Sequence, residues 1–554
     1  MTPDALAALV SATVSDLIAG NRLSLPSGYR VTASVERPKN RDHGDYATNV
    51  AMTLAKPSGT PPRVIGEMLA AELAKSPAIA RAEVAGPGFV NITLEAASQG
   101  EVASRIVAED GHFGHGTTQA GRWVNIEFIS ANPTGPIHLG HARWAAVGDA
   151  IARVLAAQGA VVTREFYIND RGVQMDRYGE SIMNAAHGLP APEGGYHGSY
   201  IKDLAAQIVA NDPTITQLPV DEQLVMFREL GYRLQLEQQQ ETLTRFGTTF
   251  DVWYSERTLH DSGAVERAFD KLREQGHMYE ADGAVWLRTT DFDDDKDRVL
   301  VKADGDLTYF ASDTAYYVDK RARGNDLCIY LLGADHHGYV DRLRAVASCA
   351  GDDPDHSIEV LIGQLVKMYK GGEEVRLSKR AGNILTLDDL IDEVGTDAAR
   401  YSLIRYPVDS PLILDVDLLV RRTNDNPVYY VQYASARIAS VLRNAAELDI
   451  DWRSEPFDPA LLDHERESDL LGVLAEFPRV VASAAELREP HRVARYLETL
   501  ATAYHRFYDN CRVLPMGDEP LGGQHVARLW LCAASRQTFV NGLGLLGVSA
   551  PERM

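Results

Sequence analysis

Apolar and polar residues follow two different rhythms near the N-terminus. Apolar side chains at helical spacing predict a first helix (Leu6, Leu9, Val10, Val14 and Leu17). Alternation over residues 29–35 predicts a strand, and a second helical pattern covers residues 64–73. Residues 110–121 are rich in Gly, His and Thr and follow neither period, which is typical of a linker. We therefore expect residues 1–108 to form a separate α+β module.

Strand-like runs and helical patterns then alternate between residues 122 and 420. A strand-like run over 123–129 leads into an alanine-rich helical pattern over 142–158, and strand-like runs return over 328–333 and 360–368. Such alternation is typical of an α/β fold. Between its two halves, residues from about 175 to 290 carry helical patterns rich in Gln and Glu, which indicates an insertion.

The pattern becomes all-helical from about residue 421 to residue 554. One apolar stripe recurs at helical spacing (Val431, Ala434, Ile438, Val441 and Ala445). Tyr429, Tyr433 and Arg437 stand four apart on another face of the same predicted helix. A tyrosine beside an arginine suits an unstacked base and its phosphate, although the tyrosines also fit a packing face.

Composition narrows these expectations only slightly. The chain has 554 residues, of which 45% are hydrophobic, enough for three or four domains. Its 55 basic and 78 acidic residues give a net charge of -23, which argues against a nucleic-acid binder at face value. That argument is weak because phosphate binding depends on local patches.

Cysteine spacing and hydropathy bear on the compartment. The four cysteines (Cys328, Cys349, Cys511 and Cys532) form no CxxC pair, so neither a zinc ribbon nor a disulfide framework is expected. We find no secretory leader and no run of 18 apolar residues. A cytoplasmic location without membrane contact is the expectation.

The stretch 130–143 lies between a predicted strand and a predicted helix and indicates a phosphate-handling turn. Pro133 and Pro136 stiffen it, while Gly140 lets the backbone approach a ligand. The N–H groups and the dipole of the following helix attract an anion. His138 and His141 stand at the helix mouth as donors for charge that develops on a phosphate. The alternative is an ordinary turn with two surface histidines.

His138-Leu-Gly-His141 resembles the HIGH motif of class I aminoacyl-tRNA synthetases, and its lead-in Ser130-Ala-Asn-Pro133 is similar to that of arginyl-tRNA synthetases. The resemblance implies that His138 and His141 are catalytic. It also implies that the surrounding turn binds ATP (Ala131, Asn132, Pro133, Thr134, Gly135, Pro136, Ile137, Leu139 and Gly140).

A second motif, Arg376-Leu-Ser-Lys-Arg380, is similar to the KMSKS loop of the same class, in which a mobile segment carries lysine onto the ATP phosphates. Lys379 is retained and is expected to be the main electrostatic catalyst. Arg376 and Arg380 depart from the motif, so the division of labour between them stays open. With Ser378 they are implied as ATP-binding residues.

Several residues are candidates for the arginine site. Glu127, near the end of a predicted strand, could hold a cation beside ATP, or could simply pair with a local arginine. Tyr309 and Asp313 would share a face if their segment is helical. The family places a tyrosine and an aspartate around the guanidinium, and a carboxylate plus a second acceptor distinguishes arginine from lysine. Ser130 and Asn132 complete the implied site.

The segment 328–338 offers two interpretations. Gly333 and Asp335 close a predicted strand where class I synthetases contact the ATP ribose, and His337 is implied there too. Asp335-His-His337 is also the DHH motif of metal-dependent phosphoesterases. Those enzymes need further aspartates at other strand ends, and no Asp-x-Asp strand end lies near the N-terminus. The acidic run 291–297 suggests either a magnesium site or, preferably, a solvated loop.

Two motifs near the N-terminus, 43–50 and 86–92, are similar to the N-terminal domain of arginyl-tRNA synthetases, which in the family reaches the tRNA elbow. Strand alternation puts Phe89 and Asn91 on one face, where they could stack on a base and bond its edge. The alternative is a buried Phe with a turn-forming Asn. Segments 426–437 and 539–554 resemble the anticodon-binding domain.

Taken together, the chain resembles arginyl-tRNA synthetases over essentially its whole length. The implied fold is α/β: a class I Rossmann-type nucleotide-binding domain (122–420) with an insertion (about 175–290), an N-terminal α+β module (1–108) and a C-terminal all-helical anticodon-binding domain (421–554). The implied reaction activates L-arginine with ATP and Mg²⁺ and charges tRNA(Arg), by a chain expected to act as a monomer. An adenylyltransferase that ignores tRNA is the second hypothesis.

Overall fold

A five-stranded parallel sheet lies at the centre of the computed structural model, which describes residues 1–375 and 385–554. Its spatial order is β11 (Ile358–Gly363), β10 (Leu327–Gly333), β4 (Trp123–Glu127), β5 (Val161–Ile168) and β6 (Val252–Ser255). β4 comes first in the chain among these five strands but lies in the middle of the sheet, so the strand order reverses between β4 and β10. In doubly wound sheets the ligand crevice opens at this reversal, beyond the carboxyl ends of the strands. The predicted Rossmann-type fold is confirmed.

Helix α5 (Leu139–Ala157) follows β4 and is buried along nearly its whole length. Its alanines and Gly148 permit close packing, since a Cβ on Gly148 would lie 2.4 Å from the ring of Phe128. Besides the sheet, α5 contacts α15 (Thr396–Ile404) and α19 (Phe477–Glu486). The phosphate-turn candidate is therefore fixed to a rigid helix.

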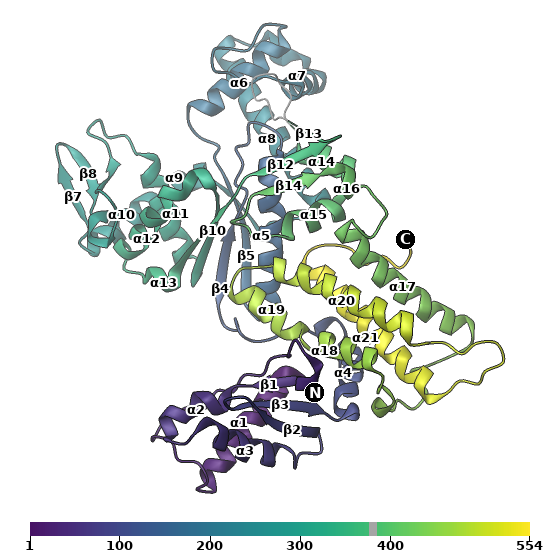
Figure 1. The fold of residues 1–554 in the computed structure, drawn as a ribbon. Helices are drawn as coiled ribbons and strands as arrows, with labels where there is room; N and C mark the ends of the chain where they lie inside the picture. The colour runs from purple at the N-terminus through teal and green to yellow at the C-terminus, as the bar shows by residue number, and fades with distance from the viewer. Residues whose placement is uncertain (376–384) are drawn as a thin grey trace.

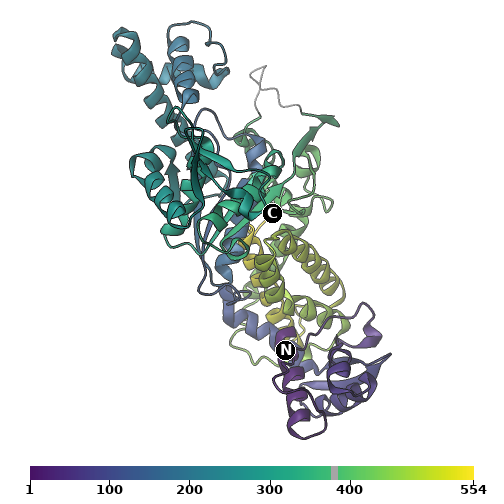
Figure 2. The same cartoon turned by 90° about the vertical axis from the view of Figure 1, so that its left-hand side faces the viewer.

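The region expected as one insertion consists of two parts. Helices α6 (Val173–Ala186), α7 (Ser199–Asn211) and α8 (Val220–Arg245) form a bundle with its own core at one end of the molecule (Figures 1 and 2). The chain then returns to the central sheet as β6, so the prediction of a continuous insertion over 175–290 is wrong.

A second part covers the β10–β11 side of the sheet (Figure 1), and it extends to residue 357, well beyond the predicted end of the insertion. It comprises α9 (Glu256–Asp261), α10 (Ala264–Glu274), an antiparallel sheet of β7 (Met278–Ala281), β8 (Ala284–Leu287) and β9 (Arg298–Val301), η4 (Thr289–Phe292), α11 (Tyr309–Ala322), η5 (Ala334–Tyr339), α12 (Val340–Cys349) and α13 (Pro354–Ser357).

The strand predicted over 360–368 is two strands in different sheets. β11 ends at Gly363, and β12 (Val366–Lys370) pairs with β13 (Glu373–Glu374) and β14 (Leu412–Asp415) instead. A Cβ on Gly363 would lie 2.3 Å from Trp144, and Arg143 Nη1 donates to the carbonyl of Gln364 at 3.2 Å. These two contacts hold the chain where it leaves the central sheet. Helices α14 (Leu387–Val394) and α16 (Val416–Leu419) complete this region.

The N-terminal residues form an antiparallel sheet covered by helices. The strands are β1 (Tyr46–Thr48), β3 (Phe89–Leu94) and β2 (Ile79–Ala85), with helices α1 (Pro3–Ala19), α2 (Val50–Ser58) and α3 (Pro62–Leu73) and the short η1 (Arg41–His43). Both predicted helices are confirmed. The strand predicted over 29–35 is wrong: this segment joins no sheet, and only Glu36 after it bridges to Ala47.

The C-terminal part is helical, as predicted. Its helices are α17 (Pro427–Glu447), η6 (Pro459–Leu461), α18 (Glu465–Ala475), α19, α20 (His491–Asn510) and α21 (Gly523–Leu545). All five residues of the predicted apolar stripe of α17 are buried.

Helix α4 (Ala96–Glu109), which follows the N-terminal sheet, packs on these C-terminal helices rather than on that sheet (Figure 1). A Cβ on its Gly100 would lie 2.4 Å from the carbonyl oxygen of Pro459, so only glycine permits this contact. The short η2 (Asp110–His112) follows. The Asn541 amide of α21 donates to the carbonyls of Asp110 and Phe113 at 2.8 and 2.9 Å, so α21 holds the end of α4 in place.

All four cysteines are buried as free thiols. Within residues 1–375 and 385–554, no helix is both long and apolar enough to cross a membrane.

Candidate active site

The carboxyl ends of β4 and β10 meet at the crevice of the central sheet. Glu127, the last residue of β4, is in register with Tyr330, and β10 ends at Gly333 as predicted. Asp335 and His337 follow in the short helix η5. Ligands of doubly wound sheets bind at this place. Residues predicted to bind ATP and arginine thus follow the carboxyl ends of both strands.

The chain leaves β4 through two residues in the left-handed region, Ile129 (φ 72°) and Ser130 (φ 44°). Such a conformation is costly for residues other than glycine, especially a β-branched one, and persists where surrounding contacts hold it. Ser130 Oγ donates to Glu127 Oε1 at 3.0 Å and accepts from the backbone N–H of Tyr167 at 3.2 Å. The structure therefore brings Ser130 and Glu127 together, as their predicted membership of one site requires.

The predicted ATP-binding turn is held from the insertion. Gln239 Nε2 on α8 donates to the carbonyls of Asn132 and Gly135 at 3.0 and 2.7 Å, and the Tyr200 hydroxyl donates to the carbonyl of Thr134 at 3.1 Å. Both donors are residues that sequence reasoning missed. The turn and the start of α5 contain every residue predicted here (Ala131, Asn132, Pro133, Thr134, Gly135, Pro136, Ile137, Leu139 and Gly140).

His138 and His141 lie together at the N-terminus of α5. His138 is the N-cap: its Nδ1 accepts from the backbone N–H of Gly140 at 3.1 Å, so its proton in the neutral form is on Nε2. The two rings stack with centroids 3.8 Å apart. A Cβ on Gly140 would lie 2.8 Å from the His138 ring, so glycine is needed there. This geometry groups two imidazoles with the helix N-terminus, which suits an anion.

The segment after the second predicted motif is tied to the first. Leu139 N–H donates to the carbonyl of Leu385 at 3.1 Å, and Leu387 N–H donates to the carbonyl of Ile137 at 2.8 Å. His138 and Thr386 form the bridge between them. Arg376, Ser378, Lys379 and Arg380 lie outside the described residues. Residues 385–387, which come next in the chain, lie beside His138.

Tyr309 and Asp313 lie one turn apart at the start of α11, which confirms the predicted helix. Thr308 caps it by accepting from the backbone N–H of Ala311 at 3.2 Å. Tyr309 is 83% exposed, at the mouth of the site. Asp313 is deeper and accepts a hydrogen bond from the Tyr339 hydroxyl. Burial raises the pKa of Asp313 to about 6; the Tyr339 hydrogen bond opposes this, and the charge of Glu127 adds to it. A bound cation would offset both the burial of the Asp313 charge and its repulsion by Glu127.

Glu127 already has an internal cation as a partner. Lys320 Nζ, fully buried, lies 2.5 Å from Glu127 Oε2 and 4.4 and 4.0 Å from the ring centroids of Tyr316 and Tyr330. The alternative interpretation, in which Glu127 forms an ion pair within the protein, is therefore correct in kind, but its partner is a lysine and not an arginine. A second cation would have to share this carboxylate. Asp313 has weaker cationic neighbours, Arg342 and His336, whose charges lower its pKa less than burial raises it.

Glu256 is an acidic residue of the site that sequence reasoning missed. It directly follows β6 and is buried beside Asp313 and Asp170. Burial raises the pKa of Glu256, Arg171 lowers it, and the two aspartates add to the rise. The rule that ligands bind beyond carboxyl ends of parallel strands would have found it, had β6 been predicted. Glu127, Asp313 and Glu256 together give the crevice a negative, cation-seeking side.

Metal ligation is not evident in the part of the chain that the structure describes, where no three His, Cys, Asp or Glu side chains form a metal-sized group. The acidic run 291–297 is held by protein partners: Asp294 pairs with Arg298 at 2.6 Å, and Asp297 accepts from the Tyr279 hydroxyl at 2.8 Å. It is therefore more structured than the predicted solvated loop.

The residues predicted to contact tRNA lie on two surfaces. Phe89 is 41% exposed and Asn91 half-buried on the outer face of β3, whose alternate residues are buried. On α17, the rings of Tyr429 and Tyr433 stack with centroids 5.8 Å apart, and Arg437 lies 4.2 Å from the Tyr508 ring centroid. The alternative of a buried Phe89 is thus wrong, whereas packing accounts for part of the α17 face.

Three family models match consecutive parts of the chain. The arginyl-tRNA synthetase N-terminal domain matches residues 4–94, the catalytic domain of class I tRNA synthetases (R) matches residues 102–182 and 217–406, and the DALR anticodon binding domain matches residues 431–554. The order agrees with the three parts of the fold.

Whole-chain comparisons give the same result. The chain is 56% identical to arginine–tRNA ligase of Frankia alni over 554 residues, and 53% identical to that of Kineococcus radiotolerans over 555 residues, covering 100% of each protein. Its fold is similar to Thermus thermophilus arginyl-tRNA synthetase (TM-score 0.76, 22% identity, 100% of both chains) and to Plasmodium falciparum arginyl-tRNA synthetase (TM-score 0.72, 16% identity, 100% and 99% of the chains). With the histidine turn at the crevice, these findings establish that the chain belongs to the arginyl-tRNA synthetase family of class I aminoacyl-tRNA synthetases.

Proposed function

We propose that this chain activates L-arginine with ATP and transfers the arginyl group to the terminal ribose of tRNA(Arg). The observation that supports it most is that β4 ends at Glu127 and leads into the histidine turn, while the charge of Glu127 acts on Asp313. The turn suits the phosphates of ATP, and the two carboxylates suit a guanidinium.

In the first step a carboxylate oxygen of arginine attacks the α-phosphorus of ATP. The bond from that phosphorus to the bridging oxygen breaks, and pyrophosphate leaves with the electron pair. No side-chain nucleophile is needed, so the protein contributes positioning and charge stabilisation. We assign the latter to His138, His141 and Lys379. In the second step a ribose hydroxyl attacks the arginyl carbonyl carbon, loses its proton, and AMP leaves.

Asp313 holds the guanidinium in this proposal, with Tyr309 at the mouth and Glu127, Ser130 and Asn132 along the side next to ATP. The turn 131–140 holds the nucleotide together with Gly333, Asp335, His337, Arg376, Ser378 and Arg380. Because the described residues offer no protein cage for Mg²⁺, we infer that it arrives on the ATP phosphates, as is usual for nucleotide enzymes.

We further propose that tRNA contacts residues 1–108 through Phe89 and Asn91 and residues 421–554 through Tyr429, Tyr433 and Arg437, while residues 122–420 perform the chemistry. A monomer is proposed, since these sites lie on one chain. A cytoplasmic location is proposed because the four cysteines form no disulfide.

Charging of bulk tRNA, tested separately with each of the twenty amino acids, decides the proposal. Only arginine should be attached, and attachment should require ATP. ATP–pyrophosphate exchange measured with and without tRNA separates the alternatives. Arginine-dependent exchange with no charging of any tRNA would support a tRNA-independent adenylyltransferase. Manganese in the purified protein together with phosphodiesterase activity would support the DHH interpretation.

A further inference from the structure

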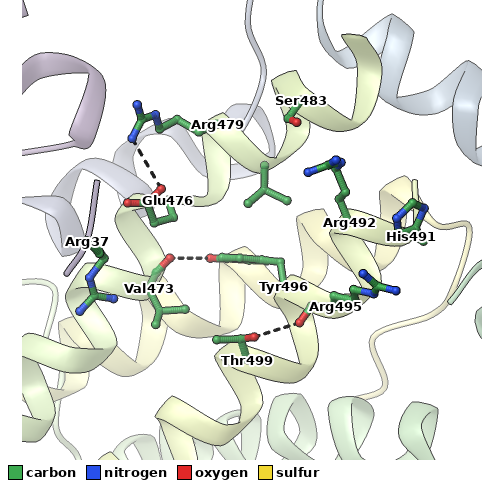
Figure 3. Close-up of a pocket in the computed structure, with 11 residues that line it drawn as sticks. Arg37, Val473, Glu476, Arg479, Ser483, His491, Arg492, Arg495, Tyr496 and Thr499 are labelled. Carbon is green, nitrogen blue, oxygen red and sulfur yellow. Dashed lines mark hydrogen bonds and ion pairs between the residues drawn. The ribbon is translucent and has the colours of Figure 1, made fainter. Parts of the chain in front are cut away.

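A seam of arginines lies where the N-terminal sheet domain meets α19 and α20. The cationic seam consists of Arg37, Arg81, Arg479, Arg492 and Arg495. One pocket of about 500 Å³ is lined by Arg37, Arg479, Arg492 and Arg495 (Figure 3). A second pocket, lined by Arg37, Arg81 and Thr93, continues from it, because Arg37 belongs to both.

The seam is positively charged although the chain carries a net charge of -23. Asp45 and Glu476 are the carboxylates that line the two pockets. Asp45 accepts from the backbone N–H of Leu94 at 2.9 Å, and burial raises the pKa of Glu476. Among the lining residues, five arginines stand against these two carboxylates. Arg81, Arg479 and Arg492 also pair with Glu83, Asp4 and Glu489 outside the lining, so the uncompensated charge of the seam rests mainly on Arg37 and Arg495.

Two of the arginines have unused donors. Arg479 lies 3.2 Å from Asp4, and Arg492 lies 2.5 Å from Glu489. Among the described residues, no hydrogen bond or ion pair joins the guanidinium of Arg37 or Arg495 to a partner. Arg495 is exposed on α20 and lines the pocket, where its side chain lies near His491 (Figure 3). A guanidinium in such a position suits a phosphate, which it can bind through two parallel hydrogen bonds.

The seam connects the two surfaces already proposed for tRNA. Thr93 lies opposite Arg81 in the β2–β3 pair, on the same face of β3 as Phe89 and Asn91. At the other end, Arg495, Thr499 and Thr502 follow each other along one side of α20. The Thr502 hydroxyl lies 3.1 Å from that of Tyr430, and the His505 ring lies 6.0 Å from that of Tyr433. A chain of phosphates could pass from the sheet to α17 over the seam.

We propose that the cationic seam binds the sugar–phosphate backbone of tRNA between the parts that contact the N-terminal sheet and α17. The proposal rests on the proposed function. Such contacts position a nucleic acid without reading its sequence, and each one releases bound counterions. Arg495 and Arg81, at opposite ends of the seam, are the expected phosphate ligands.

The test measures tRNA affinity by filter binding at several salt concentrations between about 50 and 200 mM. Arg81→Gln and Arg495→Gln should each weaken binding several-fold at low salt and reduce the slope of log affinity against log salt by about one, and the double variant by about two. Arg495→Lys should retain most of the slope because it keeps the charge. Arg37 is left intact, since it packs on Gly472 and its replacement could shift the domains.

Arg273→Gln on α10 is the matched control, an exposed arginine far from the seam in sequence, and should leave the slope unchanged. The KM values for arginine and ATP at saturating tRNA should be the same in all variants. A double variant with the wild-type salt slope would overturn the proposal. If the wild type charges no tRNA, the proposed function fails instead, so the two failures are distinguishable. Calorimetric binding of inorganic phosphate that needs Arg495, combined with unchanged tRNA binding, would assign the seam to a small anion and also overturn it.

Discussion

The carboxyl group of Asp313 is buried, and burial disfavours its charged form. Such a perturbed pKa is common where a binding site accepts a cation. Asp313→Asn keeps the shape but removes the charge. We expect the KM for arginine in ATP–pyrophosphate exchange to rise roughly a hundred-fold, which corresponds to about 3 kcal/mol of lost binding free energy, because a guanidinium would be left without its carboxylate. The KM for ATP should change less than two-fold, an estimate of about 0.4 kcal/mol at most.

Asp306→Asn is the control for this experiment, because Asp306 is an exposed aspartate just before α11. It should leave both KM values at their wild-type level. Equal rises in the KM for arginine and for ATP in Asp313→Asn would remove Asp313 from the arginine site.

The same carboxylate predicts a pH dependence. Its pKa is raised to about 6 in the protein without arginine, and guanidinium binding requires the charged form. Arginine affinity should therefore be flat above about pH 7 and fall toward ten-fold per pH unit below about pH 6. Calorimetry between pH 5 and 8 should also detect proton release on binding near pH 6. Asp313→Asn should lose this dependence, and its persistence in that variant would assign it to another group.

Linkage gives the matching stability effect. Between the ordinary pKa of 3.8 and about 6, the folded protein holds a proton on Asp313 that the unfolded chain has released. The contribution of this group to stability therefore falls as pH rises through this window and stays low at pH 7. Asp313→Asn should accordingly be more stable than the wild type at pH 7 and lose that advantage near pH 4.

At this scale, sequence reasoning found residues whose type and position in a motif are both informative. His138 and His141 lie at the start of a helix and Asp313 lies within one, as their sequence context predicted. Lys320 and Glu256 were missed because their roles depend on depth: Lys320 reaches Glu127 only through the packing of α11 on β4, and Glu256 matters only because β6 lies in the central sheet.

Helix α8 fixes the position of the predicted ATP-binding turn through hydrogen bonds from Gln239. Gln239 lies on α8, more than a hundred residues beyond the turn whose carbonyls it holds. Gln239→Met should reduce kcat for adenylate formation about ten-fold, since losing its two hydrogen bonds costs on the order of 1 to 3 kcal/mol and frees the turn. Single-turnover exchange measures this. Gln240→Met, the adjacent residue, is the matched control, and an equal loss of rate in both variants would mean that α8 as a whole is disturbed.

The predicted KMSKS-like stretch lies outside the described residues, and Leu385 and Leu387, which follow it in the chain, pair with residues 137–139. Lys379→Ala should lower kcat for adenylate formation about a hundred- to a thousand-fold. This corresponds to an activation barrier raised by about 2.7 to 4 kcal/mol, by analogy with a lost oxyanion donor. ATP affinity should hardly change, because the contact forms mainly in the transition state. Lys370→Ala, on β12, is the control lysine. A fall in ATP affinity as large as the fall in rate would make Lys379 a ground-state anchor.

Whole elements were predictable where their hydrophobic period was long, as in α1, α5 and α17. The errors occurred at short segments. Residues 29–35 alternate as a strand does but find no partner strand. Residues 360–368 are mostly apolar and were predicted as one strand, but the chain changes sheets after Gly363. β6 has four residues, too few to show a period. Strand pairing depends on distant parts of the chain, which local patterns do not reveal.

At the scale of the whole molecule, Arg400 joins parts that are distant in sequence. Its side chain is fully buried, lies 2.5 Å from Asp149 of α5, and donates to the carbonyls of Phe246 and Leu546 at 3.1 Å. Arg400→Met should destabilise this junction by about 3 to 5 kcal/mol, because the buried carbonyls of Phe246 and Leu546 would lose their donor and Asp149 would keep only Arg153 and Arg164 as partners. Urea unfolding followed by limited proteolysis near residue 546 measures it.

The double variant Arg400→Met with Asp149→Leu should recover only part of that loss, since it removes both buried charges but also takes the carboxylate from Arg153 and Arg164. Arg63→Met is the control, because Arg63 pairs with Glu67 at the surface and should be dispensable. Equal instability of the single and double variants would show that the hydrogen bonds to the carbonyls matter more than the ion pair.

The contact between α4 and α21 also has a consequence for how the protein is made. The carbonyl of Phe113 accepts a hydrogen bond from the side-chain amide of Asn541, which is synthesised 428 residues later. At about 5 to 20 residues per second, a ribosome needs roughly 20 to 90 seconds to supply it. During that time the apolar side of α4 has no cover, although the N-terminal sheet behind it can already fold. A growing chain halted before α21 should therefore be a substrate for chaperones, and residues 96–113 are where they should bind.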